Sequence, residues 1–344
     1  MQLKKLLRLS HWWNYKVPSM LCFVYFFIGV NNISLKISLL HFFLFLLWII
    51  GTGSLGYVLN DIADIKSDRL AGKTNYISSL SFTGRILLIL FLIIIALIPW
   101  FYLPLNIPLV FLISGEYILF ILYSFRPFRL KESLFGGIVA DALYGHVIIV
   151  LISAMTFNQM GSPGNISYVF FIILFLWQFI KGVRNILLHQ IDDIKNDKRS
   201  SITTFVVKYR PIATINLINR VILPLELMVF TIILGYMSLY LKYFYVTFII
   251  FLVFTCFKFS MWKVFSIPLR HFKLKFLYFI NDFYEEWMPV IVLLYLAVIS
   301  PVYSVLVVMH FLFFSAIIES FCADIKAINK NIHDQINESR EKTY

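Results

Sequence analysis

The chain has 344 residues, of which 60% are hydrophobic and 14% are charged, with a net charge of +12 and a mean hydropathy of +0.84. A water-soluble core cannot bury this much apolar side chain, so we expect an all-α polytopic membrane protein embedded in a lipid bilayer. Three scattered cysteines, Cys22, Cys256 and Cys322, show neither CxxC nor Cys-His spacing, so we expect no disulfide framework and no zinc site.

Apolar runs of roughly 20 residues, the length that crosses a bilayer as a helix, recur along the chain. The basic segment 1–16 leads directly into the first run, which predicts a first anchor instead of a cleaved signal peptide. The last run contains Pro301 and is either one tilted helix or a hairpin, so ten spans are the alternative to nine. The nine expected spans cover residues 17–35, 37–59, 85–102, 106–123, 134–153, 166–189, 213–240, 243–262 and 287–319.

Lysine and arginine are concentrated in alternate connections between these spans. On one side they number only two, Lys36 and Lys242. The positive-inside rule therefore predicts that the N-terminus and the basic connections are cytoplasmic. Because topology accounts for the cations, the net charge gives no reason to expect a nucleic-acid partner. The expected cytoplasmic side holds twenty lysine and arginine residues, in residues 1–16, 60–85, 124–133, 190–212 and 263–285.

Before the first span, Lys16 follows several aromatic residues at an expected membrane interface. This is either an ordinary aromatic belt or a site where Lys16 projects toward an anionic ligand. The second span contains a GxGxxG pattern at residues 51–56, but no βαβ unit surrounds it. We interpret it as small residues that let neighbouring helices approach the helix closely.

An acidic motif ends the second span. Asp61, Asp64 and Asp68 are spaced i, i+3 and i+7, so in a helix they share one face, with Asn60 at its edge. Three carboxylates on one face repel each other unless a cation holds them, and hard oxygen ligands beside a substrate phosphate suit Mg²⁺. The alternative is a solvated acidic helix end.

Several cations follow on the same expected side. Lys73 and the Asn75 amide lie in the next connection, where they either reach a bound diphosphate or simply follow the positive-inside rule. Tyr123, Arg129 and Lys131 follow the fourth span, and cations there favour anionic ligands.

Ionisable residues also occur within the expected spans, where they are costly unless they face the bundle interior or water. Asp141 and His146 in the fifth span either bind a polar substrate group or satisfy each other. Glu116 and Glu226 belong to the same class, and the sequence offers no neighbour to pair with them.

The sixth span ends in a second acidic motif. Asp193 and Asp197 lie one helical turn apart, and Arg184 and His189 precede them at intervals that we interpret as one stripe facing the first motif. With Asp192, the stretches 59–69 and 189–199 that carry the two motifs hold six of the eighteen acidic residues.

These two motifs resemble the UbiA superfamily of intramembrane prenyltransferases, whose members carry NDxxDxxxD after the second helix and DxxxD after the sixth. The tyrosine and cations after the fourth helix also resemble the family pattern. The resemblance implies a single transmembrane prenyltransferase domain at residues 1–319, with about nine helices around a central cavity that opens to the cytoplasmic side. Residues 320–344 form a polar tail with no assigned role.

The resemblance also implies the roles of the site residues. It implies that Mg²⁺ bridges the motifs to a polyprenyl diphosphate and that the prenyl group passes, as an allylic carbocation, to a small-molecule acceptor, commonly an electron-rich aromatic ring of the quinone-precursor kind. Lys16, Asp141, Arg184 and His189 are our candidates for holding or deprotonating that acceptor. The metal and diphosphate ligands would be Asn60, Asp61, Asp64, Asp68, Asp193 and Asp197, with Lys73, Arg129 and Lys131 neutralising phosphate charge and Tyr123 beside them.

One departure from the family is visible, because no Arg-Pro pair follows the first motif between Asp68 and Arg85. This weakens the expectation of an acceptor such as phosphoribosyl diphosphate. Two other functions remain open. A membrane terpene cyclase would share the ionisation step but quench the cation within its own chain, and a polytopic transporter would explain the intramembrane acids but not the aspartates gathered at one cytoplasmic mouth.

Overall fold

The computed structural model describes residues 2–70, 72–161, 166–199, 203–260 and 278–341. Most of the connection 263–285, which we expected to be cytoplasmic, lies outside these residues. The chain forms two compact units. The first comprises residues 1–12 and 23–233, and the second comprises residues 13–22 and 234–344. The helix α2 (Leu9–Val30) contributes to both.

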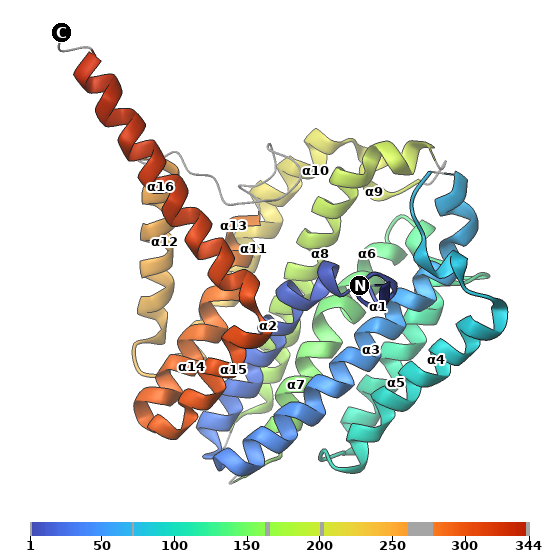
Figure 1. The fold of residues 1–344 in the computed structure, drawn as a ribbon, viewed down its shortest axis with the longest axis horizontal. Coiled ribbons are helices and arrows are strands. Elements are labelled where there is room, and N and C mark those ends of the chain that lie inside the picture. Colours follow the sequence, from blue (N-terminus) through green and yellow to red (C-terminus); the bar gives the residue numbers. More distant parts are fainter. Residues whose placement is uncertain (1, 71, 162–165, 200–202, 261–277, 342–344) are drawn as a thin grey trace. The chain divides into compact units, whose positions relative to one another are not determined.

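The first unit is a bundle of apolar helices that run side by side (Figure 1). The helix containing residues 136–158 is the most enclosed, with 72% of its apolar window buried, whereas 17% is buried for residues 82–101. The former therefore lies at the centre of this unit and the latter at its surface. The main helices of the first unit are α3 (Leu35–Leu70), α4 (Phe82–Leu97), α5 (Ile107–Ser124), α6 (Gly136–Ala142), α7 (Ile148–Asn158), α8 (Tyr168–Arg199), α10 (Pro211–Leu217) and most of α11 (Leu223–Ser238).

Short elements complete the unit around the ends of these helices. A π-helical turn joins α6 to α7, so the two form one continuous segment. A continuous helical segment keeps its backbone groups bonded, as a lipid environment requires. The short elements are α1 (Gln2–Leu6), η1 (Tyr76–Ser79), η2 (Ile98–Phe101), η3 (Leu130–Glu132), η4 (Leu143–Val147), α9 (Phe205–Tyr209) and η5 (Ile218–Ile222).

Two of the helices, α3 and α8, are longer than a bilayer requires. At 1.5 Å per residue, a helix of about 20 residues crosses the apolar layer, and α3 and α8 have 36 and 32 residues. Each therefore continues beyond its apolar part into its acidic motif. Both end on the same side of the first unit, at the top of Figure 1.

The glycines in the middle of α3 allow the close helix contacts that their spacing predicted. A Cβ atom on Gly51 would lie 2.6 Å from the backbone nitrogen of Ala96 in the segment 82–101, and one on Gly53 would lie 2.9 Å from the Trp12 ring. A Cβ on Gly56 would lie 2.9 Å from Phe120 on α5. The prediction that these small residues admit neighbouring elements is confirmed.

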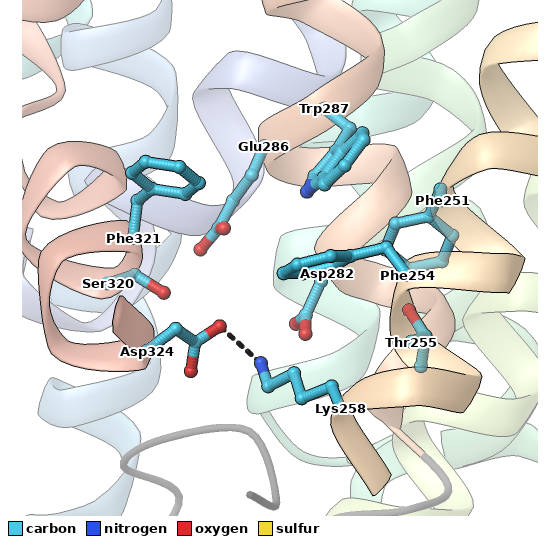
Figure 2. A pocket seen from close by; sticks show the side chains of 10 residues that line it. All are labelled: Phe251, Phe254, Thr255, Lys258, Asp282, Glu286, Trp287, Ser320, Phe321 and Asp324. Atoms are coloured by element: carbon cyan, nitrogen blue, oxygen red, sulfur yellow. Dashed lines mark hydrogen bonds and ion pairs between the residues drawn. The ribbon is translucent and has the colours of Figure 1, made fainter. Parts of the chain in front are cut away.

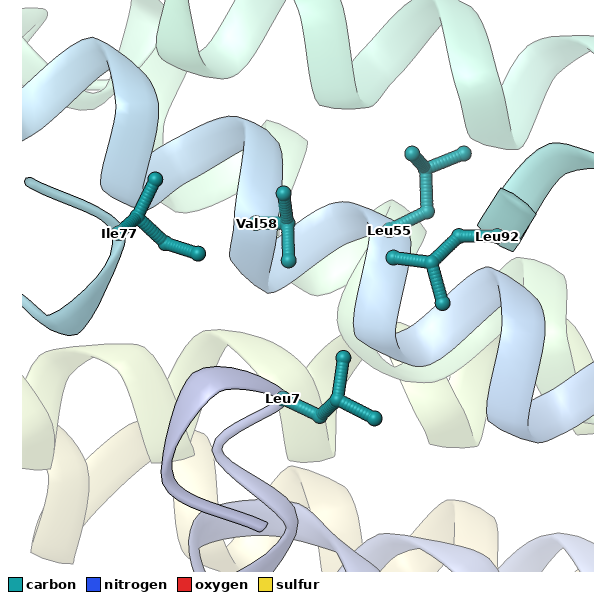
Figure 3. Close-up of a cluster of buried hydrophobic side chains, with 5 residues drawn as sticks. All are labelled: Leu7, Leu55, Val58, Ile77 and Leu92. Carbon is teal, nitrogen blue, oxygen red and sulfur yellow. The ribbon is translucent and has the colours of Figure 1, made fainter. Parts of the chain in front are cut away.

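A small apolar cluster lies around the part of α3 that precedes the first motif in sequence (Figure 3). Leu55 and Val58 of α3 meet Leu92 of α4, Ile77 of η1 and Leu7 from the N-terminal segment, and all five are buried. The cluster fixes the N-terminal segment and η1 against the end of α3, where the acidic motif begins.

Six helices of the described residues are long and apolar enough to cross a membrane, and a seventh is possible if one bent pair is a single span. The six correspond to the second to seventh expected spans. The expectation of nine spans remains a prediction, because α2, α12 (Phe244–Ser260) and the last helices do not meet the same length and composition test.

The second unit ends in a helical hairpin followed by a long helix. The segment α13 (Phe279–Asp282), η7 (Phe283–Trp287) and α14 (Met288–Ile299) is continuous, and α14 packs against α15 (Ser304–Phe313) after a turn at η8 (Pro301–Tyr303). Of the two arrangements expected for the run 287–319, the structure forms the hairpin, because Pro301 ends the first arm. The polar tail is not irregular, since α16 (Ser315–Glu341) is a helix.

A charged cluster joins α12, the segment before α14 and α16 within this unit (Figure 2). Lys258 forms an ion pair with Asp324, and Asp282, Glu286 and Trp287 line the same cavity. The cavity is about 20 Å³, enough for a single water molecule. The cluster therefore ties elements of the second unit together and is too small to hold a ligand larger than water.

Candidate functional site

The first acidic motif lies on about the last three turns of α3. Asp61 is 2% exposed, and the Asp64 side chain is 18% exposed. Their spacing places both on the face of α3 that packs into the first unit, while Lys66 on another face is exposed. Buried carboxylates require partners, so their surroundings show how the protein satisfies them.

Asp61 is held by an arginine from the N-terminal segment. The Arg8 Nε donates to Asp61 Oδ2 at 2.9 Å, and Arg8 Nη2 lies 2.8 Å from Oδ1, so the guanidinium faces both carboxylate oxygens. The Nε contact is a charge-assisted hydrogen bond, and the Nη2 contact is a close ion pair without hydrogen-bond geometry. Arg8 is thus part of the motif's surroundings, although it lies 53 residues away in sequence.

Asp64 is held by two cations from the connection after α5. The Arg129 Nη2 donates to Asp64 Oδ1 at 3.0 Å, and Lys131 Nζ donates to the same oxygen at 2.5 Å and to Asn60 Oδ1 at 2.9 Å. Burial lowers the pKa of Lys131 from its usual value, because desolvation outweighs the opposing attraction of Asp64. Arg129 and Lys131 therefore come together with Asn60 and Asp64, as the sequence suggested.

Asp68 is tied to the loop that follows α3. The Asn75 side chain donates to Asp68 Oδ2 and to the Asp61 carbonyl, both at 2.8 Å, and the Lys73 amide donates to the Asp68 carbonyl at 2.9 Å. The Lys73 side chain is exposed and lies within electrostatic range of Asp197 in the second motif. This loop cation therefore links the surroundings of the two motifs.

The second motif is more open. The Asp193 side chain is 38% exposed, and its carboxylate lies 3.9 Å from His189, whose own side chain is 69% exposed. Asn196 donates to Asp193 Oδ1 at 3.1 Å, and Thr204 donates to Asp197 Oδ2 at 3.1 Å. These carboxylates are consequently bonded mainly by neutral donors and keep oxygen atoms accessible.

Arg184 does not belong to the stripe in which the sequence placed it. Its side chain is fully buried, and its Nε and Nη2 donate to the Glu226 carboxylate at 2.6 and 2.9 Å. A step of five residues from Arg184 to His189 turns a helix by about 140° away from an aligned position, so the two lie on different faces of α8. We therefore revise Arg184 from a catalytic candidate to a residue that positions α8 against α11.

An aromatic group lies next to the first motif. Tyr123 is within electrostatic range of both Asp64 and Asp141, and Tyr144 donates to Asp141 Oδ1 at 2.9 Å. The ring of Tyr144 contacts Tyr123 and Phe120 edge to face, with centroids 5.1 and 5.4 Å apart. Asp141 is thus bonded to Tyr144, a partner three residues away, and the Tyr123 ring packs against Tyr144.

The oxygen donors of the first motif fit a magnesium site that a substrate completes. Within the part of the chain that the structure describes, no three acidic, histidine or cysteine side chains form a cage for an ion. Mg²⁺ usually takes one or two carboxylates and fills its remaining positions with water and substrate phosphates. Lys16 belongs to the second unit. The role that we expected for it, in binding the acceptor or an anionic ligand, therefore stays a prediction.

Two site residues, Arg8 and Tyr144, were not found from the sequence, and a third residue, Gln178, lies on the helix that carries the second motif. Arg8 lies in a basic segment where any of several cations would have fitted the positive-inside rule. Tyr144 follows Asp141 at an i+3 spacing, and side chains at this spacing are neighbours on a helix, so their contact could have been predicted from the sequence. Gln178 is 1% exposed, and neither its amide nitrogen nor its oxygen has a hydrogen-bond partner among the described residues. It lies 11 residues before His189, close to the same face of α8.

The fold is similar to those of solved proteins. A UbiA homolog from Archaeoglobus fulgidus bound to GPP and Mg²⁺ is 18% identical, with a TM-score of 0.58, and the match covers 85% of this chain and 99% of that chain. A structure of a UbiA homolog from A. fulgidus bound to DMAPP and Mg²⁺ is 17% identical, with a TM-score of 0.55 and the same coverage of both chains. At this identity the likeness shows the shared fold alone.

A comparison with curated proteins found no match. The model of the UbiA prenyltransferase family matches residues 20–281, which include both acidic motifs and the cations after α5. Because the match spans most of the sequence and the fold agrees with it, the chain belongs to the UbiA prenyltransferase family, an integral membrane family of prenyl-transferring enzymes.

Proposed function

We propose that this protein transfers a prenyl group from a prenyl or polyprenyl diphosphate to an aromatic, quinone-precursor-like acceptor, with Mg²⁺ as cofactor. The observation that carries the proposal is the arrangement around Asp64. Arg129 and Lys131 both donate to Asp64 Oδ1 there, and Lys131 also donates to the Asn60 amide oxygen. The binding of GPP, DMAPP and Mg²⁺ by the structurally similar A. fulgidus protein supports it.

The metal and diphosphate would be held by the acidic motifs. Asp61, Asp64 and Asp68 would supply oxygen ligands from α3, and Asp193 and Asp197 from α8. When bound, Mg²⁺ supplies Lewis-acid stabilisation of the charge that develops on the diphosphate. The same side of the first unit carries both helix ends (Figure 1), so one diphosphate could bridge them.

Arg129, Lys131 and Lys73 would neutralise the departing diphosphate. The C–O bond of the allylic donor breaks, the electron pair leaves with the diphosphate, and positive charge develops on the prenyl carbon. Fixed cations beside the leaving oxygen stabilise this separation of charge without reorganising. Arg129 and Lys131 are 13% exposed at their side chains, so their attraction is weakly screened by water.

The aromatic group beside Asp64 would shield the allylic cation. Ring faces attract a cation by about 0.5–2 kcal/mol each, and Tyr123, Tyr144 and Phe120 already contact each other. The acceptor ring would attack the cation and lose a proton to a nearby base. Asp141 is our candidate for that base, and Gln178 and His189 are candidates for binding polar groups of the acceptor.

We place the N-terminus and both motifs on the cytoplasmic side, because the basic connections gather there. This orientation can be read from the accessibility of single cysteines introduced at Lys66 and Lys36 in sealed vesicles. Labelling of the position 66 cysteine only after the cytoplasmic side is opened would support it, and the reverse pattern would contradict it.

The function is tested by incubating the purified protein with Mg²⁺ and prenyl diphosphates of increasing chain length, with and without a panel of phenolic acceptors. Transfer predicts a prenylated product that requires the acceptor. A hydrocarbon formed from the diphosphate alone would instead identify a terpene cyclase. Removal of metal with EDTA should abolish turnover and added Mg²⁺ should restore it, whereas indifference to EDTA would contradict the metal assignment.

A further inference from the structure

The N-terminal residues 2–9, which we call the N-terminal strap, are fixed next to the first motif at three points. Lys5 Nζ lies 5.6 Å from the centroid of the Tyr76 ring in η1. Leu7 is 6% exposed in the apolar cluster of Figure 3. Arg8, the next residue, faces both oxygens of Asp61. The strap therefore places one guanidinium on one carboxylate of the motif.

The backbone at Arg8 is held in an uncommon conformation. Arg8 has φ 47° and ψ 31°, in the left-handed region, which costs about 1–2 kcal/mol for a residue other than glycine. Arg129, which contacts Asp64, is also left-handed, with φ 39°. Such conformations persist only where the surroundings hold them, and here the two ion pairs contribute to holding both arginines in place.

The first two aspartates are consequently already paired with the protein's own cations. Asp61 has Arg8, and Asp64 has Arg129 and Lys131. A metal ion arriving by itself would have to compete with them for the same oxygens. It would also separate Arg8 and Lys131 from the carboxylates that they contact, which is unfavourable for partly buried cations, whereas Arg129 would keep its ion pair with Glu132.

A diphosphate changes this balance, because its oxygens accept hydrogen bonds from guanidinium and ammonium groups. When metal and diphosphate arrive together, each displaced cation gains a new partner. Arg8 differs from the two other cations in coming from the N-terminal strap, which packs on the end of α3, on η1 and, through Leu7, on Leu92 of α4. The Arg8 side chain is 29% exposed, against 13% for Arg129 and for Lys131. It can therefore change partners without moving a transmembrane helix.

We propose that Arg8 makes metal binding depend on diphosphate: it neutralises Asp61 in the substrate-free protein and passes to the diphosphate when Mg²⁺ and diphosphate bind together. This inference rests on the function proposed above. Arg8 is a positioning residue in this scheme, and it suppresses unproductive binding of the metal alone.

The test measures Mg²⁺ binding by calorimetry to the purified full chain, alone and with saturating inorganic pyrophosphate. Arg8→Gln is compared with Lys4→Gln, which removes the same charge from an exposed side chain of the same segment. We expect Arg8→Gln to bind Mg²⁺ alone about tenfold more tightly, equivalent to about 1.4 kcal/mol. The ratio of Mg²⁺ affinities with and without pyrophosphate should shrink by at least the same factor, while Lys4→Gln matches the wild type.

Unchanged or weaker binding of Mg²⁺ alone by a folded Arg8→Gln variant would overturn the inference, as would an unchanged ratio. Thermal unfolding of both variants establishes that they are folded. If Arg8→Gln does not fold, Arg8→Lys serves instead, because it keeps the charge but loses the two-point contact with Asp61 and should show the same changes to a smaller extent. Failure of the proposed function looks different, because the wild-type protein would then bind no Mg²⁺ even with pyrophosphate.

Discussion

The two acidic motifs have similar sequences but different surroundings. In the first, Asp61 is almost completely buried and Asp64 contacts two cations. In the second, Asp193 is 38% exposed and its basic neighbour, His189, lies 3.9 Å away. The first motif is thus part of the packed structure of the first unit, whereas the second is an open group of oxygen ligands at a helix end.

This difference follows from where the aspartates lie relative to the bundle. A carboxylate inside a low-dielectric region needs a compensating charge, while one at the surface is solvated by water. Removing an aspartate should therefore have two separable effects, on turnover and on folding. The first motif should show both effects and the second only the effect on turnover.

The largest expected effect is on turnover and is common to both motifs. Asp64→Ala and Asp193→Ala should each reduce prenyl transfer by about a hundredfold or more, because each removes a group proposed to stabilise the leaving diphosphate. Initial rates with saturating Mg²⁺ provide the measurement, and Glu319→Ala, an exposed carboxylate on α16, is the control. Near-normal turnover in either motif variant would remove that motif from the site.

The next effect is on stability and concerns the buried ion pair between α8, which carries the second motif, and α11. Arg184→Leu or Glu226→Leu alone should destabilise the protein by about 3–5 kcal/mol, because each leaves one buried charge without its partner. The double variant should recover much of this loss, since it removes both charges. Unfolding in mixed micelles checks this, and a double variant as unstable as the sum of the single variants would show that the pair is not coupled.

A smaller effect sharpens the comparison between the motifs directly. Asp64→Asn should lower the free energy of unfolding by about 2 kcal/mol, since Arg129 and Lys131 lose their shared counter-ion in a mostly buried position. Asp193→Asn should change it by less than about 0.5 kcal/mol, as is usual at exposed positions. Equal changes in both variants would show that the surroundings of the motifs do not differ energetically.

The smallest expected effect concerns the packing of the two helices that carry the motifs, at positions within their apolar parts. A Cβ on Gly51 of α3 or Gly182 of α8 would lie within 2.7 Å of backbone atoms of Ala96 and Ala142, respectively. Alanine at either position should therefore destabilise by about 1 kcal/mol, after a gain in helix propensity is included. Gly115→Ala meets no atom within 4 Å and should be neutral or stabilising. Different losses of stability at Gly51 and Gly182 would show that α3 and α8 differ in packing as well as in the burial of their acidic motifs.

Much of the candidate site could be predicted from patterns local in sequence. The i, i+3, i+7 spacing placed Asp61, Asp64 and Asp68 on one face, and the apolar run before them predicted a helix. The proximity of Arg129 and Lys131 to the first motif also agreed with expectation. These inferences succeed because helix periodicity and span length follow from the chain itself.

Contacts between distant segments were not predictable in the same way. Arg184 and Glu226 each appeared as an isolated charge within an apolar run, and their 42-residue separation gave no pattern to connect them. The assignment of Arg8 to Asp61 depends on how the N-terminal strap packs on Leu55 and Val58. Many cations satisfy a topology rule equally well, so only packing distinguishes one from another.

The sequence by itself determined that this is a membrane-embedded helical protein with two aspartate motifs at the ends of apolar segments, because composition and periodicity are properties of single stretches of chain. Only the tertiary structure decided which cation neutralises which aspartate, and which of the two motifs is buried. Those outcomes depend on distances between segments far apart in sequence, and the energy of a buried charge is set by its nearest neighbours in space.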